Sequence, residues 1–337
     1  MPTRLDRLSA RRIDPDDARL LNEVYTRMLV QTDSVKYVVG AMQPIDPGYT
    51  KNTYAAAERV WNQLDSHLTI ACDREYQGSV TNDTHIKAKS DIDVLLLVQH
   101  FFGLEPPQIP ANPYMGDPVQ DLLNLRKEVI DTLPGAFPLA SVDSSGSKSI
   151  SIEGGSLRRK VDVVPSNWYN TNEYVGTNQK IYRGVQILDA KHGTRLKNTP
   201  FLHNTWIDQK DNATIGGLRK AARLLKSLKY DTESIDLSSY DLVSIAFNIP
   251  DWQLSVPHGM ELSLLHSCYA FCEELSRDAA KRNSLWVPDR HRRIFEEGHA
   301  TKHGLDALVA ALWYLENDVL RENQRSFRKL EEARVEY

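Results

Sequence analysis

The chain of 337 residues has few cysteines, no long apolar run and no excess of positive charge. Its three cysteines are too few for a disulfide framework. No stretch approaches the roughly 18 apolar residues of a membrane span, and the first residues lack the apolar core of a signal peptide. The net charge of −4, from 41 basic and 45 acidic residues, argues against an extended nucleic-acid surface. We therefore expect a cytoplasmic protein without a membrane partner.

The first 200 residues mix helical and strand patterns. Apolar spacing, capping residues and breakers predict helices over Asp14–Val30, Lys51–Ile70 and Asp121–Leu133, the last ending before Pro134. Short runs rich in branched residues predict strands at "DIDVLLLVQ", "KSISIE", "SLRRKVDVVPS" and "GVQILD", and the Gly154-Gly155 pair predicts a hairpin between the second and third. This part of the chain is predicted to be α+β, with helices around a small mixed sheet.

Helical patterns dominate from Pro200 onward. The predicted helices are Asn204–Gln209, Ile215–Tyr230, Ser239–Asn248, Met260–Arg282 and Leu305 to about Glu331. We therefore divide the chain into a core of residues 1–200, which includes the first helices, and a helical lobe of residues 201–337. The alternative is that the first helices pack on the C-terminal lobe.

Two carboxylates stand at the mouth of a buried strand in "GSVTNDTHIKAKSDIDVLLLV" (Gly78–Val98). Residues i and i+2 of a strand share a face, so Asp91 and Asp93 point to one spot. Asp162, in "KVDVVP", lies between apolar residues of another predicted strand. Buried charge is costly unless it is paired or binds a metal. Three carboxylates on adjacent strands suit two Mg²⁺ ions about 3.5–4 Å apart.

Gly78-Ser79 opens the same stretch, and eleven residues separate the pair from Asp91. Glycine lets the backbone approach a phosphate closely, and backbone N–H groups and the serine hydroxyl can hold anionic oxygens. The pair predicts a phosphate-binding turn beside the metal site. Ser79 as a plain turn residue is the alternative.

These motifs together resemble a known family. Gly-Ser, the eleven-residue gap, Asp-x-Asp and a later lone Asp resemble the DNA polymerase β-like nucleotidyltransferase superfamily. "DTHIKAKSDID" is similar to the corresponding loop of oligoadenylate synthetases and of bacterial cGAS/DncV-like nucleotidyltransferases (CD-NTases). "NTPFLHNTWIDQKDNATIGGLRKAARLLKSLK" and "LSSYDLVSIAF" are similar to the CD-NTase helical segments. The resemblance covers about residues 50–315 and implies a bilobed fold with the active site in the cleft.

The resemblance also implies residue roles. Asp91, Asp93 and Asp162 would be the catalytic metal ligands for two Mg²⁺ ions, with Mn²⁺ able to substitute. Asp162 would also help to deprotonate the attacking ribose hydroxyl. Gly78 and Ser79 would bind the β- and γ-phosphates of the nucleotide. Lys226 and Ser239 would reach the triphosphate from the helical lobe, with Lys229 as the second choice to Lys226.

The function implied is synthesis of a cyclic di- or trinucleotide second messenger from NTPs, with ATP, GTP or both as the expected substrates. In the family such a product activates a downstream effector in bacterial antiphage defence (CBASS), and a regulatory protein partner is a further expectation. One alternative is a linear 2′–5′ or 3′–5′ oligonucleotide synthetase or RNA-tailing enzyme. Another is an inactive nucleotide-binding protein on the same fold, which the three intact carboxylates disfavour.

Several residues have plainer interpretations. Asp162 can pair with Arg158 or Arg159, and the lysines of "RLLKSLK" can form a solvated helix face. The segment Asp289–Phe295, "DRHRRIF", is interpreted as a solvated turn rather than a nucleic-acid site. Ser239 is a natural helix N-cap, a role compatible with phosphate binding.

Other side chains are assigned only from residue type. Cys268 and Cys272 are interpreted as buried apolar residues rather than metal ligands. Tyr182, Trp206 and Tyr240 are candidates for stacking on a base, although each is more often a core residue.

Overall fold

The structure is a computed structural model that describes residues 2–14, 28 and 31–335, with side chains as far as residue 324. It contains two compact units. The helical unit comprises Met1–Ile45, Thr84–Lys87 and Trp206–Tyr337, and the sheet unit comprises Asp46–Asp83 and Ala88–Thr205. Residues 1–45 therefore group with the later helices, as in the alternative division, rather than with the core. Most of the helix predicted over Asp14–Val30 lies outside the described residues.

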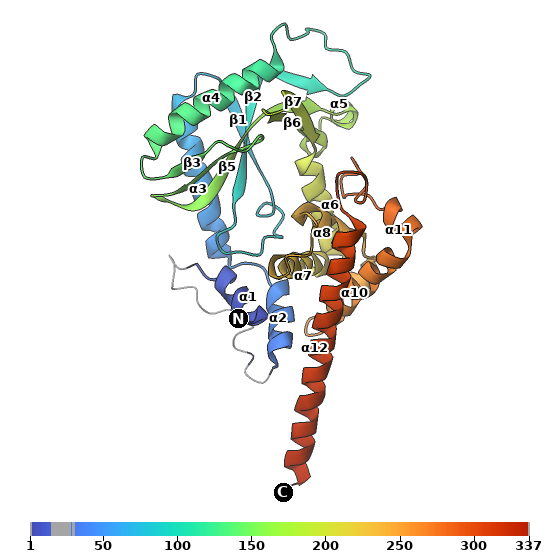
Figure 1. Cartoon of the computed structure of the whole chain (residues 1–337). Coiled ribbons are helices and arrows are strands. Elements are labelled where there is room, and N and C mark those ends of the chain that lie inside the picture. The colour runs from blue at the N-terminus through green and yellow to red at the C-terminus, as the bar shows by residue number, and fades with distance from the viewer. Residues whose placement is uncertain (1, 15–27, 29–30, 336–337) are drawn as a thin grey trace. The chain divides into compact units, whose positions relative to one another are not determined.

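One mixed sheet organises the sheet unit (Figure 1). Its order is β1-β2-β5-β4-β3, and β6 and β7 extend it beyond the second half of β5. Among the described residues the strands are β1 (Cys72–Gln77), β2 (Ile92–Leu104), β3 (Ser141–Asp143), β4 (Ile150–Gly154), β5 (Leu157–Asn170), β6 (Arg183–Asp189) and β7 (Thr194–Asn198). The pair β2–β5 is parallel, whereas the other pairs are antiparallel. The mixed sheet with its helices confirms the predicted α+β class.

The predicted hairpin at Gly154-Gly155 is confirmed. Strands β4 and β5 pair antiparallel and close with Gly154 opposite Leu157. Both glycines have positive φ, +86° and +56°, a backbone conformation that favours residues without a Cβ. The turn places β4 beside the first half of β5, where Asp162 lies.

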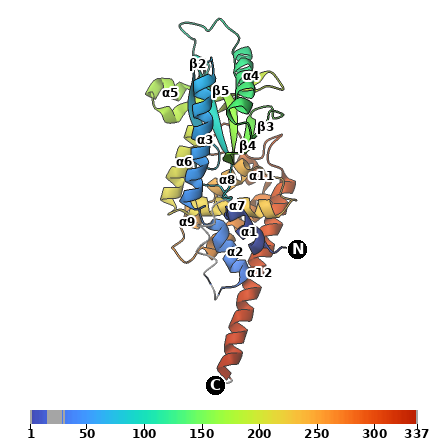
Figure 2. The same ribbon diagram turned by 90° about the vertical axis from the view of Figure 1, so that its left-hand side faces the viewer.

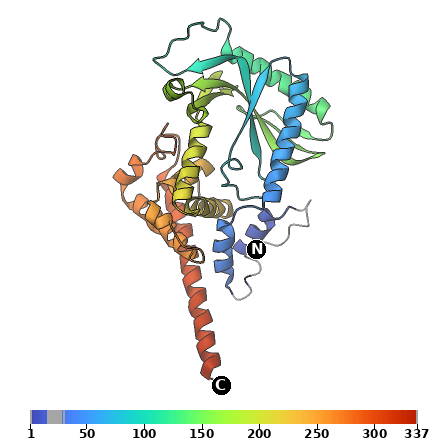
Figure 3. The same cartoon turned by 180° about the vertical axis from the view of Figure 1, so that it is seen from behind.

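Helices α3 (Pro47–His67) and α4 (Pro118–Ala136) cover one face of the sheet (Figures 1 and 3). Their apolar side chains form one cluster with those of β2, β4 and β5, including Val60, Leu125, Val94 and Val163. The helix predicted over Asp121–Leu133 does not end before Pro134, because α4 continues to Ala136. A proline in the last turn forfeits a single backbone hydrogen bond, so the helix tolerates it there.

The opposite face of the sheet carries a smaller apolar cluster. It contains Leu95 and Leu97 of β2, Val164 and Trp168 of β5, and residues of β6. Because side chains alternate along a strand, Asp93 and Asp162 belong to this face. The less covered face of the sheet is thus the one that presents the predicted carboxylates. Short helical segments, α5 (Asn172–Thr177) and η3 (Lys180–Tyr182), link β5 to β6.

The helical unit buries one large apolar cluster. Helices α1, α2 and α7 pack together, and α10 lies against α12 (Figures 1 and 2). The bounds are α1 (Arg4–Arg12), α2 (Asp33–Met42), α7 (Gly217–Asp231), α8 (Ser239–Asn248), α9 (Asp251–Leu254), α10 (Leu262–Arg277), α11 (Ala279–Ser284) and α12 (Lys302–Val335). Helix α6 (Pro200–Ala213) begins in the sheet unit and ends in the helical unit. No helix among the residues described has the length and apolar character needed to cross a bilayer.

The structure contradicts the predictions for two segments of the helical unit. The helix expected over Met260–Arg282 is divided, because Asp278 has extended backbone angles and caps α11 by accepting from the N–H of Lys281. The segment Asp289–Phe295 is not a solvated turn. Asp289 and Ile294 are buried, and Arg292 pairs with Asp241 at 2.6 Å. Cys268 and Cys272 are free and buried, as predicted.

Candidate active site

Asp93 and Asp162 lie directly opposite each other on adjacent parallel strands. The backbone register pairs Asp93 of β2 with Asp162 of β5. Neighbouring strands are about 4.8 Å apart, so two side chains on the same face at paired positions meet. The predicted convergence of these two carboxylates follows from the register alone.

Asp91 precedes β2 by one residue and is the most exposed of the three carboxylates, with 58% of its side chain accessible against 12% for Asp162. The ammonium of Lys160 links the two: its Nζ lies 3.3 Å from Asp162 Oδ2 and 3.9 Å from Asp91 Oδ2. Lys160, rather than the expected Arg158 or Arg159, forms this pair with Asp162, and the sequence patterns did not single it out. The i, i+2 spacing of Lys160 and Asp162 on a strand was the available signal.

Ser151 completes the surroundings of Asp162. Strand β4 places it opposite Asp162, and its hydroxyl donates a hydrogen bond to Asp162 Oδ1. This bond uses one carboxylate oxygen, while the other faces Lys160. Ser151 was also missed, because only the register of the hairpin brings it to this position.

The pKa of Asp93 is raised to about 7. Burial is the main cause, followed by the negative charges of Asp162 and Asp91, while a hydrogen bond from Gln77 and the charge of Lys160 act in the opposite direction. Both main causes penalise the ionised carboxylate. The site therefore holds more negative charge than its own residues neutralise, which is typical of a cation-binding or catalytic site.

Gly78 lies against Asp93. It has φ +97°, and a Cβ added to it would come within 3.2 Å of Asp93 Oδ2. The N–H and the hydroxyl of Thr81 donate to the Gly78 carbonyl at 3.2 and 2.8 Å, which closes a turn after β1. Ser79 is partly buried in this turn. The structure therefore brings Gly78 to the carboxylates through a conformation and a contact that suit glycine.

The donor chemistry of the site suits Mg²⁺, a hard cation that prefers carboxylate oxygens. Asp93 and Asp162 are adjacent, and the raised pKa of Asp93 reflects burial together with the repulsion from Asp162. Across the described ranges, however, no three His, Cys, Asp or Glu side chains are grouped in a way that could hold a metal ion. The three aspartates are ligands of the right type on adjacent strands rather than a closed coordination shell, and metal binding stays a prediction.

The other predicted phosphate-binding residues belong to the helical unit. Lys226 is buried on α7, and its Nζ donates to the Thr84 carbonyl at 2.7 Å. Thr84 lies in the loop between Ser79 and Asp91. Because Lys226 is buried against this loop, it is not part of a solvated helix face. Lys229 donates to the carbonyl of Leu237, immediately before α8.

Ser239 is the first residue of α8 and is exposed. The prediction that it is the N-cap is wrong, because Ser238 accepts from the N–H of Asp241 in a capping box. Ser239 still lies at a helix N-terminus, a position that favours anions. Phosphate binding by Lys226, Lys229 and Ser239 stays a prediction.

The three candidate stacking residues differ in their surroundings. Tyr240 is partly buried, and its hydroxyl donates to Asp289 at 3.0 Å. Trp206 is 42% exposed, whereas Tyr182 lies in η3, where its carbonyl accepts from Thr171. None of these contacts identifies a base-binding site.

A pocket of about 570 Å³ in the sheet unit opens along β1. Its charged groups are largely paired. The indole of Trp168 donates to Asp73 at 3.0 Å, Arg183 stacks on the Trp168 ring, and Lys180 pairs with Glu75. Trp168 is six residues beyond Asp162 on β5, roughly 20 Å along the strand. Another lining residue, Glu75, lies opposite Leu95 of β2, two residues from Asp93, so this end of the pocket lies nearer the carboxylates.

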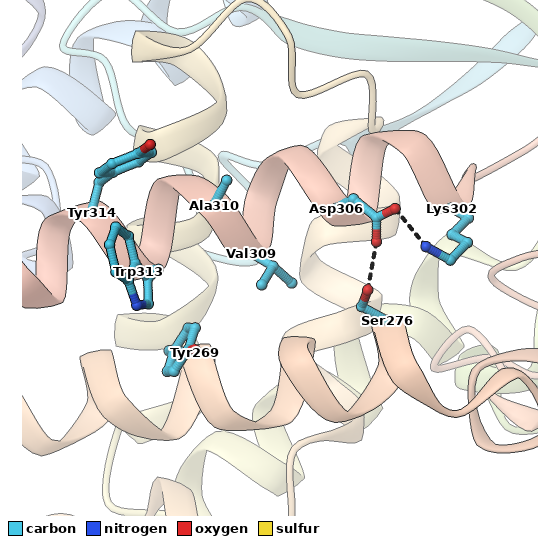
Figure 4. A pocket seen from close by; sticks show the side chains of 8 residues that line it. All are labelled: Tyr269, Ser276, Lys302, Asp306, Val309, Ala310, Trp313 and Tyr314. Atoms are coloured by element: carbon cyan, nitrogen blue, oxygen red, sulfur yellow. Dashed lines mark hydrogen bonds and ion pairs between the residues drawn. The ribbon is translucent and has the colours of Figure 1, made fainter.

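A second pocket, of about 400 Å³, lies between α10 and α12 (Figure 4). Tyr269, Trp313 and Tyr314 line one end. At the other end Asp306 accepts from Ser276 at 2.5 Å and pairs with Lys302 at 2.5 Å. Its polar groups satisfy one another, and it contains none of the predicted site residues.

Comparison with known proteins gives consistent relatives. A cyclic dinucleotide synthase CdnE from Yersinia aleksiciae is 37% identical over 314 residues, which cover 91% of this chain and 82% of the relative. A c-di-GMP synthase from a Lachnospiraceae bacterium is 33% identical over 279 residues, covering 74% and 79% of the two chains. The structure of a STING-associated CdnE c-di-GMP synthase from Capnocytophaga granulosa matches with a TM-score of 0.77 and 29% identity, covering 94% of this chain and 98% of that one. No protein-family model matches the chain.

Proposed function

Because the chain belongs to the CD-NTase family of nucleotidyltransferases, we propose that it joins two nucleoside triphosphates into a cyclic dinucleotide and releases pyrophosphate. The relatives confirm the family resemblance and the predicted core of a mixed sheet flanked by helices. The single observation that carries the proposed chemistry is the pairing of Asp93 with Asp162 in register on adjacent parallel strands.

Asp91, Asp93 and Asp162 would hold Mg²⁺, which when bound supplies charge neutralisation for the triphosphate and the pentavalent α-phosphate. The N–H groups of the Gly78-Ser79 turn would bind the β- and γ-phosphates, with Lys226 and Ser239 as further contacts. Asp162 accepts the proton of the attacking ribose hydroxyl. The hydroxyl oxygen bonds to the α-phosphorus as pyrophosphate leaves, and a second such transfer closes the ring.

GTP is the proposed substrate. The Lachnospiraceae relative and the Capnocytophaga structure are both named as c-di-GMP synthases. The Yersinia relative is named only as a cyclic dinucleotide synthase, so ATP stays the alternative. We extend the proposal to an antiphage role in which the product activates an effector protein in the cytoplasm, since the Capnocytophaga structure is described as STING-associated.

The test is incubation of the pure protein with each radiolabelled NTP, alone and in pairs, with Mg²⁺ or Mn²⁺, followed by phosphatase and chromatography. GTP alone should give a phosphatase-resistant product with no terminal phosphate. The double variant Asp91→Asn with Asp93→Asn should lower the rate of pyrophosphate release at least about a thousandfold, because both metal ligands lose their charge. Asp131→Asn, which removes an exposed carboxylate of α4, is the matched control and should retain the wild-type rate.

Three other outcomes would redirect the proposal. A phosphatase-sensitive ladder would indicate a linear synthetase. A phosphatase-resistant product that forms only when ATP is present would show that GTP is not the sole substrate. Absence of product together with absence of Mg²⁺-dependent binding of a non-hydrolysable NTP would indicate an inactive nucleotidyltransferase fold.

A further inference from the structure

Lys160 occupies an unusual position for a lysine. It lies on β5 two residues before Asp162 and on the same face of the strand, and 39% of its side chain is exposed. Its ammonium approaches two carboxylates that reach the site from different strands, Asp162 at 3.3 Å and Asp91 at 3.9 Å. Both of these carboxylates are proposed metal ligands.

The charges explain why a cation is needed there. When all are ionised, three carboxylates and one ammonium leave the cluster with a net charge of −2. Glu153 adds a further, weaker negative influence on Lys160. Ser151, which donates to Asp162, and Gln77, which donates to Asp93, are uncharged. Without Lys160 the carboxylates would repel one another more strongly in the metal-free protein.

An ammonium in this position competes with a metal ion. Mg²⁺ requires carboxylate oxygens at about 2.0–2.1 Å, and Lys160 lies against an oxygen of Asp162 and one of Asp91. The ammonium sits on a flexible four-carbon stem, so it can leave the carboxylates without a movement of the strand. A lysine that served only as a structural ion pair would not need to leave.

On the basis of the proposed function, we propose that Lys160 is an internal counter-ion of the metal site: it neutralises Asp91 and Asp162 in the metal-free protein and is displaced when the metal binds. Lys160 is thus a positioning residue, and it lowers the affinity of the site for a metal ion that binds without nucleotide. The metal-free site keeps its geometry because Lys160 holds it, and the metal must replace one favourable interaction with another.

The test is the affinity of the full chain for Mn²⁺ without nucleotide, measured from the electron paramagnetic resonance signal of free Mn²⁺. Lys160→Met keeps the length of the side chain and removes its charge, so it should tighten Mn²⁺ binding by about tenfold. Lys160→Arg retains a cation and should stay within about threefold of wild type. Lys127→Met, which removes the i, i+4 partner of Asp131 on α4, should have the wild-type affinity.

A second readout separates this role from a structural one. In EDTA the melting temperature of Lys160→Met should fall below that of wild type, and saturating Mn²⁺ should remove the difference. Unchanged or weaker Mn²⁺ binding in Lys160→Met would overturn the inference while leaving the metal site intact. Absence of Mn²⁺ binding in the wild type would overturn both the inference and the proposed metal-dependent function.

Discussion

The carboxylates of the two units have different surroundings. In the helical unit, the side chain of Asp231 is 1% exposed and accepts from Arg11 at 2.9 Å, Arg7 at 3.3 Å and the Tyr37 hydroxyl at 2.7 Å. In the sheet unit, Lys160 approaches Asp91 and Asp162, and the pKa of Asp93 is raised, mainly by burial. A carboxylate with several cations of its own stabilises the fold. A cluster of carboxylates with too little positive charge is arranged for a ligand.

Asp231→Asn should show the structural role most strongly. Removing the charge leaves Arg11, whose side chain is 3% exposed, without its counter-ion. Breaking a buried pair by removing one partner is strongly destabilising, so we expect a loss of about 3 kcal/mol in the free energy of unfolding. Thermal and denaturant unfolding measure the change, with Asp131→Asn as an exposed control expected to stay within about 0.5 kcal/mol. A loss no larger than the control's would show that the buried cluster contributes little.

Asp93→Asn should raise the free energy of unfolding of the metal-free protein, whereas Asp231→Asn should lower it. The pKa of Asp93 rises from 3.8 to about 7 on folding, so the folded chain binds this proton more tightly than the unfolded chain. Stability from this group is therefore present below about pH 4 and is lost as the pH rises toward 7. The variant should be more stable than wild type by about 2 kcal/mol at pH 8 and by less at pH 5.

Unfolding in EDTA at the two pH values measures this difference. Asp131→Asn should show no such dependence. If Asp93→Asn were less stable than wild type at pH 8, the contrast between the two units would fail, since Asp93 would then be a stabilising carboxylate like Asp231.

Gly78→Ala and Gly154→Ala form a matched pair with smaller effects. Both positions have positive φ, so each substitution should cost about 1 kcal/mol of stability. The added Cβ meets Asp93 at Gly78, whereas it meets nothing within 4 Å at Gly154. We expect Mn²⁺ binding to weaken severalfold in Gly78→Ala and to stay unchanged in Gly154→Ala. Equal affinities would show that Gly78 is needed only for its backbone conformation.

The sequence predicts the parts of this site that depend on short-range patterns. The i, i+2 rule places Asp91 and Asp93, and the apolar run after them identifies β2. The carboxylate of Asp162 stands out because apolar residues flank it. By contrast, β1 was missed, because "CDREYQ" lacks an apolar run and pairs only with β2 at the sheet edge.

Features set by long-range contacts were beyond these patterns. Ser151 reaches Asp162 only through the register of a hairpin. Residues 1–45 join the helical unit because α1 and α2 pack against α7, almost 200 residues later. The division at Asp278 depends on a local capping interaction that competes with a sequence of good helix formers. In each case a tertiary or capping contact overrides the local propensity.

The assignment of Thr84–Lys87 to the helical unit has a consequence for the gene. These four residues lie in the loop between Gly78-Ser79 and Asp91, so the chain passes between the two units four times, after residues 45, 83, 87 and 205. Neither unit is a continuous stretch of coding sequence. A block of gene that carried the whole sheet unit, residues 46–205, would therefore also carry Thr84–Lys87 of the helical unit.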